Sequence, residues 1–162
     1  MKDRHVLALE RVLSRRRQFE RKLNALLASQ RAESGALSEA LDERRSAADT
    51  QAGELARQDD KIEAMLGGAA FRADELLMLR EFRSVSAERH AMLEAEAGQA
   101  AAVLAAKAAE IDDTRTKIVR NRSRVDIYDK RRHALVQAIE TAIEDAQDEE
   151  ASESRRPRGR AF

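Results

Sequence analysis

The 162-residue chain contains no cysteine, no tryptophan and a single proline, and only 3% of its residues are aromatic. The absence of cysteine excludes disulfides and thiolate metal sites. The shortage of aromatic and turn-forming residues argues against a β-sandwich or a β-barrel, which needs both in quantity. The longest run without a charged residue, residues 97–106, is too short to span a bilayer.

Charged residues, in contrast, are abundant and balanced. Lys and Arg number 30, as do Asp and Glu, and together they make up 37% of the chain. A chain rich in Ala, Leu, Glu and Arg suits long helices. The glycine pair Gly67-Gly68 marks the place where such a helix would end and reverse, since glycine allows a left-handed backbone conformation. The sequence therefore predicts one helix over about 4–66, a turn over about 67–70 and a second helix over about 71–147.

Apolar residues repeat every seven positions in both predicted helices, which is typical of a coiled coil. In the second helix one series contains Leu76, Ala97, Leu104, Ile111, Ile118, Val125 and Ile139, and a parallel series follows three residues later. Polar residues such as Ser86, Thr114 and Asn121 interrupt the series, and polar residues at such positions usually set the register. In the first helix we expect a stripe through Leu9, Val12, Phe19, Leu23, Leu26, Leu37 and Leu41, with a phase shift near Leu41 before Ala48, Leu55 and Ile62.

A short turn between two long amphipathic helices makes them pack antiparallel. The predicted fold is therefore all-α, with two long helices forming an antiparallel coiled-coil hairpin over residues 1–147. Residues that face each other should then have numbers that add up to about 135. Residues 148–162 are polar, lack periodicity and contain the only proline, so we interpret them as a charged flexible tail.

Charge is distributed in blocks along the chain. From Met1 to Arg31 there are nine basic and three acidic residues, and from Asp113 to Arg132 there are eight and three. Antiparallel pairing would place these stretches side by side as a basic foot, made of Arg15, Arg16, Arg17, Arg21, Lys22, Arg120, Arg122 and Arg124. Residues 140–153 carry seven acidic residues and no basic one. The foot is either an ordinary solvated surface or a docking surface for an acidic partner.

A second apolar series follows the turn. Phe71, Met78, Val85 and Met92 repeat every seven residues, and Phe82 lies beside them; we name these five residues the tip stripe. The first helix cannot cover this stripe and the hairpin contact at once. Exposed methionines and aromatics are typical of protein-binding surfaces. Two alternatives stay open, because Met65, Leu66 and Phe71 could fold over the stripe as a cap, or a homodimer could hide it.

Motifs for catalysis or metal binding are missing. The sequence has no phosphate-binding loop, no dinucleotide-binding motif and no HExxH. His5 and His133 could approach each other, but without an organised carboxylate they would form a weak metal site. Two packed helices also provide no closed pocket in which carboxylates could be desolvated and their pKa values shifted. We therefore expect no enzyme activity, no cofactor and no metal.

Two segments, LALERVLSRRRQFERKLNALL near the start and IVRNRSRVDIYDKRR in the second helix, resemble the FliJ/YscO family of type III secretion. The resemblance implies a cytoplasmic coiled-coil stalk, peripheral to a membrane-embedded secretion apparatus. Such a stalk would connect a hexameric export ATPase with the export gate and would bind secretion chaperones. The basic foot would suit an acidic ATPase lumen, and the tip stripe would suit a gate or chaperone contact. The acidic segment 140–153 and the Arg-rich end depart from this pattern.

Two other functions remain open at this point. The chain could be a structural homo-oligomeric coiled-coil scaffold that uses the tip stripe as a self-interface. It could also be a nucleic-acid-associated coiled coil that uses the foot, although no stacking aromatics interleave with the basic runs. We expect protein partners, no small-molecule substrate, no membrane insertion, and a monomer or weak homodimer.

Overall fold

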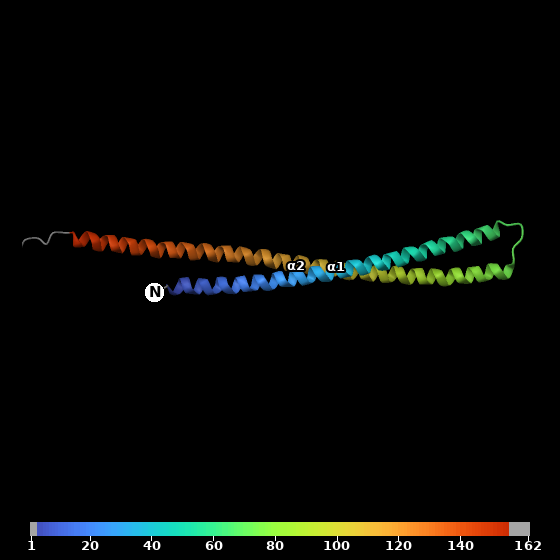
Figure 1. Cartoon of the computed structure of the whole chain (residues 1–162), viewed down its shortest axis with the longest axis horizontal. Coiled ribbons are helices and arrows are strands. Elements are labelled where there is room, and N and C mark those ends of the chain that lie inside the picture. Colours follow the sequence, from blue (N-terminus) through green and yellow to red (C-terminus); the bar gives the residue numbers. More distant parts are fainter. Residues whose placement is uncertain (1–2, 156–162) are drawn as a thin grey trace, which may run out of the picture. The chain divides into compact units, whose positions relative to one another are not determined.

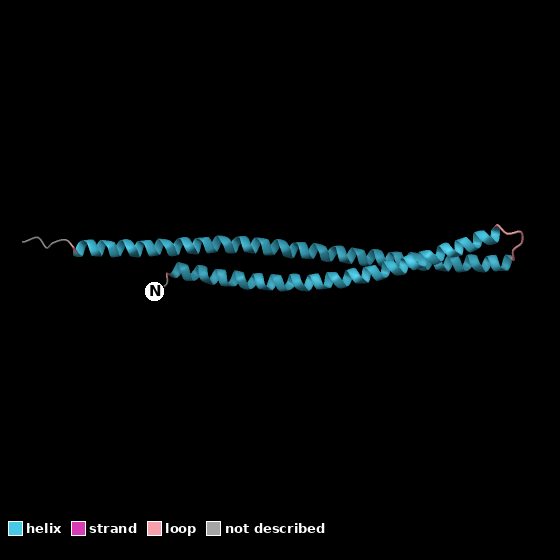
Figure 2. Ribbon diagram, turned by 45° about the horizontal axis from the view of Figure 1, so that its top comes forward, coloured by secondary structure: helices cyan, strands magenta, loops and turns pink. Residues whose placement is uncertain are grey.

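In the computed structural model, which describes residues 3–155, the chain forms two long α-helices (Figure 1). α1 spans Arg4–Leu66 and α2 spans Ala73–Ser154. Residues 67–72 form the loop between them, and no strand occurs within residues 3–155 (Figure 2). α1 covers the same residues as the first predicted helix, whereas α2 begins slightly later than expected because the loop is longer than the predicted turn.

Asp3 caps the start of α1. One of its side-chain oxygens accepts a hydrogen bond from the His5 amide at 2.6 Å, and its backbone carbonyl accepts one from the Leu7 amide at 3.1 Å. A side-chain acceptor at this position satisfies an amide that has no partner within the helix. α2 has Asp74 and Glu75 in its first turn, where negative charge interacts favourably with the helix dipole.

The glycine pair ends α1 without adopting a left-handed conformation. The Gly67 amide donates to the Glu63 carbonyl at 2.9 Å, and the Gly68 amide donates to the Met65 carbonyl at 3.4 Å. No glycine within residues 3–155 has a positive φ angle. The expectation of a left-handed turn at the pair is therefore wrong. The chain reverses gradually over residues 67–72 instead of sharply at two positions.

α2 continues to Ser154, past its predicted end at Gln147. Residues 148–154 are therefore helical, and their interpretation as part of a flexible tail is wrong. The physical reason is that Glu, Gln and Ala all favour the helix, and the first residue that would stop it, Pro157, comes later. The rest of the predicted tail, residues 156–162, lies outside the described residues.

The described chain divides into two compact units, each built from one stretch of α1 and one of α2. The first unit contains the residues up to Leu26 and those from Thr114 onward, and the second contains Leu27–Asp113. In the first unit Asn121 donates to the Arg16 carbonyl at 3.0 Å. In the second unit Gln58 donates to the Ser86 hydroxyl at 3.1 Å.

In both units, the numbers of two residues that form a hydrogen bond or an ion pair between α1 and α2 add up to about 140. The two helices therefore run antiparallel in each unit. The longer loop explains why this value exceeds the predicted one of about 135. The fold class is the predicted one, because the chain is all-α and its two long helices pair as an antiparallel coiled-coil hairpin.

The side of α2 that packs against α1 follows the predicted heptad series. Its buried apolar residues are Leu76, Ile111 and Ile118. The polar members Ser86, Thr114 and Asn121 are buried as well, with between 2% and 6% of their surface exposed. Buried polar groups require hydrogen-bond partners, which only one alignment of the helices supplies. These residues therefore act as the register-setting positions that the sequence predicts.

The packing side of α1 differs from its predicted stripe. Its buried apolar residues are Val6, Leu13, Leu23, Leu41 and Ala48, and Gln30, Gln51 and Gln58 are buried with them. All of these fit one heptad register, so the predicted phase shift near Leu41 is wrong. Phe19 and Leu26, which we expected in the stripe, are 44% and 46% exposed. The prediction followed the apolar residues, whereas the actual packing side of α1 accepts glutamines.

Lys107 connects the two helices of the second unit. Its side chain is only 17% exposed and lies 2.7 Å from the carboxylates of both Glu33 and Glu110. Hydrogen bonds to Glu110 and Glu33 raise the pKa of Lys107, and the hydrogen bond from Lys107 lowers the pKa of Glu33. A lysine can place its aliphatic stem along a helix contact while its ammonium group reaches acids at the edge. Lys107 therefore lies in the contact between α1 and α2 although it is charged.

The new register of α1 can be tested with two identical substitutions. We expect Leu13→Ala to lower the free energy of unfolding by about 2–3 kcal/mol, because Leu13 is 2% exposed. Leu26→Ala is the matched control and should cost less than about 1 kcal/mol, since that side chain is half exposed. Denaturant unfolding followed by circular dichroism measures both. Equal losses would contradict the register.

The conformation of the glycine pair leads to a second prediction. A Cβ atom on Gly67 would lie 3.4 Å from the Glu63 carbonyl oxygen, and one on Gly68 would lie 3.4 Å from the Met65 carbonyl oxygen. Neither contact forces a rearrangement, and alanine restricts the unfolded chain. We expect Gly67→Ala/Gly68→Ala to raise stability by about 0.5–1 kcal/mol. A loss of more than about 1 kcal/mol in thermal unfolding would indicate that one glycine does need a left-handed conformation.

Candidate protein-binding surfaces

The basic foot lies within the first unit. Arg15, Arg17, Arg21 and Lys22 are exposed on α1, and Arg16 is half-buried there. The foot residues of α2 are Arg120, Arg122 and Arg124, and all three are exposed. The structure thus brings the two predicted basic stretches together, as antiparallel pairing requires.

One groove gathers part of the foot, and we name it the foot groove. It is lined by Arg16, Phe19, Lys117, Arg120, Asn121 and Arg124. Four of these side chains are basic and none is acidic, while the exposed ring of Phe19 adds apolar surface between them. Asn121 donates through Nδ2 to the Arg16 carbonyl, but its Oδ1 is buried without a hydrogen-bond partner within residues 3–155. The foot groove therefore combines positive charge with an exposed aromatic ring.

A second groove in the same unit contains other foot residues. It is lined by Glu10, Leu13, Ser14, Arg17, Arg21 and Arg132. Its charge is mixed, because Glu10 is present and Arg132 pairs with Asp129 at 3.0 Å. Arg15 and Lys22 line neither groove, and Arg122 pairs with Glu20 at 2.6 Å. The predicted foot is therefore not uniform, and the foot groove is its most strongly basic part.

Sequence reasoning left Phe19, Lys117 and Arg132 out of the foot. The apolar pattern places Phe19 in the hairpin contact instead. Lys117 stands one heptad before Arg124, and this spacing is the signal that could have placed it on the same face of α2.

The tip stripe is exposed in the second unit. The exposed fraction ranges from 48% for Phe71 to 71% for Met78, with Phe82, Val85 and Met92 between them. Leu66 is itself 47% exposed. The alternative in which residues near the turn cap the stripe is therefore wrong for this structure. An exposed apolar series of this kind is a candidate contact for another protein.

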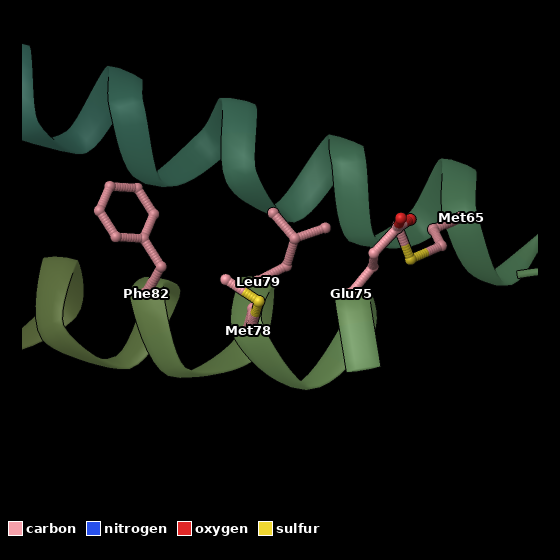
Figure 3. Close-up of a pocket in the computed structure, with 5 residues that line it drawn as sticks. All are labelled: Met65, Glu75, Met78, Leu79 and Phe82. Atoms are coloured by element: carbon pink, nitrogen blue, oxygen red, sulfur yellow. The ribbon is translucent and has the colours of Figure 1, made fainter. Parts of the chain in front are cut away.

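A shallow pocket of about 480 Å³ lies at one side of the tip stripe, lined by Met65, Glu75, Met78, Leu79 and Phe82 (Figure 3). Leu79 and Phe82 extend from α2 toward α1 in this view, and Met65 is contributed by α1. The pocket brings Met78 and Phe82 together, whereas Phe71, Val85 and Met92 do not line it. Glu75 gives the pocket one acidic edge.

An ion pair links the helices near Phe82. Arg83 donates from Nε to Asp59 at 2.7 Å and from a terminal nitrogen to the other carboxylate oxygen at 3.4 Å. The hydrogen bond from Arg83 lowers the pKa of Asp59, and the same hydrogen bond raises the pKa of Arg83. Both side chains are almost half exposed, so the pair orients the two helices more than it stabilises them.

The described residues offer little for other kinds of chemistry. Within residues 3–155 no group of three or more His, Cys, Asp or Glu side chains is placed to hold a metal ion. Neither helix has a described stretch that is long and apolar enough to cross a membrane. The features that remain in this part of the chain are grooves and an apolar stripe on paired helices.

These features define a two-helix coiled-coil protein with one basic and one apolar exposed surface. A family model described as "Bacterial type III secretion protein (HrpB7)" matches residues 4–156, so the chain belongs to the HrpB7 family of type III secretion proteins. This family is related to the FliJ/YscO-type stalk proteins, which agrees with the resemblance found in the sequence. Comparisons with curated proteins and with solved structures gave no match.

Proposed function

We propose that this chain is a non-enzymatic stalk and adaptor of a type III secretion apparatus, positioned between the export ATPase, the export gate and the secretion chaperones. Its place would be in the cytoplasm, peripheral to the membrane-embedded machinery. The observation that carries the proposal is the presence of two exposed surfaces of different chemistry, the foot and the tip stripe, on a protein of this family.

The foot is the proposed contact with the ATPase. Its grooves expose arginines at short spacing on both helices, and a ring of acidic residues in a hexamer would attract them from a distance. Arginine also forms planar, two-point contacts with carboxylates. The tip stripe is the proposed contact with the gate or a chaperone, since exposed aromatic and methionine side chains adapt to apolar protein surfaces.

A structural scaffold is the second candidate. The exposed tip stripe would favour it, since two copies could bury these residues against each other. A nucleic-acid role is less well supported, because the foot groove contains a single aromatic ring and not the series of rings on which successive bases stack.

The ATPase contact is tested by reversing charge on the foot. We expect Arg15→Glu/Arg17→Glu to weaken binding to the export ATPase at least about tenfold, because both residues are exposed on the foot and opposite charge is lost. The control Arg31→Glu/Arg45→Glu changes the net charge equally at exposed positions of the second unit and should bind like the unmodified protein. Titration by surface plasmon resonance measures both, and equal behaviour would reject the foot contact.

The tip contact is tested with Phe82→Asp. Phe82 is 60% exposed, so the helical signal in circular dichroism should stay unchanged while binding to the gate or the chaperones falls at least about tenfold. Val103→Asp is the control, because Val103 is also exposed on α2 but lies outside the tip stripe. A lost helical signal in the Phe82 variant would show that this residue supports the fold. Unchanged binding would remove the stripe from the contact.

A further inference from the structure

The last turns of α2 pack against no other part of the chain within residues 3–155. Residues 140–155 are exposed without exception, and α2 continues past the start of α1 in both views (Figures 1 and 2). Most helices in proteins depend on packing against another element. Because α2 nevertheless remains helical to Ser154, its end presents a regular, unpaired helical surface.

The residues of this segment favour the helix individually, but the spacing of their charges does not. Glu140, Glu144 and Asp148 follow each other at four-residue spacing, and Asp145, Glu149 and Glu153 do the same. Like charges at this spacing repel each other on a helix surface. Ile139, Ile143 and Ala146 form an apolar stripe between the acids, and Ile143 is 52% exposed. A groove lined by basic and apolar residues would neutralise these acids and cover this apolar stripe.

The foot groove has that chemistry. Lys117, Arg120 and Arg124 stand at spacings of three and four residues on α2, so they repel each other as the acids do. Phe19 provides an exposed ring among them. The acidic segment and the foot groove therefore complement each other in charge and in apolar surface.

One chain cannot join them, because both lie on the continuous helix α2. We therefore propose that two copies of this chain associate antiparallel, with the acidic segment 140–153 of each copy in the foot groove of the other. With a two-fold axis beside about residue 133, residues 140–153 of one copy lie along residues 113–126 of its mate. The basic and acidic blocks are neighbours on α2, so a single antiparallel alignment matches both at once.

This interface differs from a dimer formed through the tip stripe. Apart from Asp113 at its edge, it uses residues of the first unit, and it leaves Phe82 and Met78 exposed. It also gives the acidic segment a role that the stalk proposal leaves open. An acidic protein partner and the second copy would compete for the same groove, but the self-association is measured on this chain alone and does not depend on the proposed function.

The test uses the full chain at tens of micromolar in sedimentation equilibrium. We expect twice the monomer mass for the unmodified protein. Glu144→Lys/Asp148→Lys and Arg120→Glu/Arg124→Glu should each raise the dissociation constant at least about tenfold, because each places like charges across the interface. Combining all four substitutions restores opposite charges and should return the dissociation constant to within about threefold of the original value.

The control Glu81→Lys/Glu88→Lys reverses two exposed acids of α2 in the second unit, and it should leave the dimer unchanged. Circular dichroism of every variant establishes that the helices persist. A monomeric unmodified protein would overturn the proposal. So would a dimer that survives either double reversal, that is lost in the control, or that the combined variant fails to restore while remaining helical.

Discussion

Two helices that pair only with each other can bury one face each, and the structure depends on how this narrow contact is made specific. A purely apolar contact between long heptad repeats permits several alignments that differ by seven residues. Here buried polar side chains interrupt it, including Gln51, Gln58 and Ser86 in the second unit and Asn121 in the first. Gln51 reaches the Ser86 carbonyl and Gln58 its hydroxyl, so Ser86 is matched to one position along α1. Polar residues at these positions lower the stability of the helix contact but fix a single register.

Because polar residues occupy packing positions, the sequence predicts the packing side of α2 better than that of α1. In α2 the packing positions hold enough Leu, Ile and Ala for the period to be visible. Even Thr114 and Asn121 can be placed, because each follows three residues after Ile111 or Ile118. In α1 glutamine occupies several packing positions, while Phe19 and Leu26 are exposed. The pattern of apolar residues therefore identifies the wrong packing positions in α1. The prediction ends α2 at Gln147 because the residues after it are polar and lack periodicity, although Glu and Ala are good helix formers and the helix continues to Ser154.

The zero net charge of the chain conceals a separation of charge that the fold makes physically relevant. Antiparallel pairing joins two basic stretches that are about a hundred residues apart in the sequence, as the contact of Arg122 with Glu20 illustrates. The foot groove itself is lined by four basic side chains and no acidic one. The acidic segment of α2 cannot fold back onto this groove, because both lie on one continuous helix. In the proposals made above, each of these surfaces contacts another molecule.

The two candidate surfaces share one feature and differ in another. Phe19 in the foot groove and Phe82 in the shallow pocket beside the tip stripe are both exposed aromatic rings next to the contact between α1 and α2. Around Phe19 the neighbours are basic, so long-range attraction would bring an acidic partner into place before apolar contact forms. Around Phe82 the lining is Met65, Met78 and Leu79 with a single acid, so short-range apolar burial must supply the affinity. In the proposed function, the foot groove would therefore select its partner by charge and the tip stripe would select its partner by apolar contact.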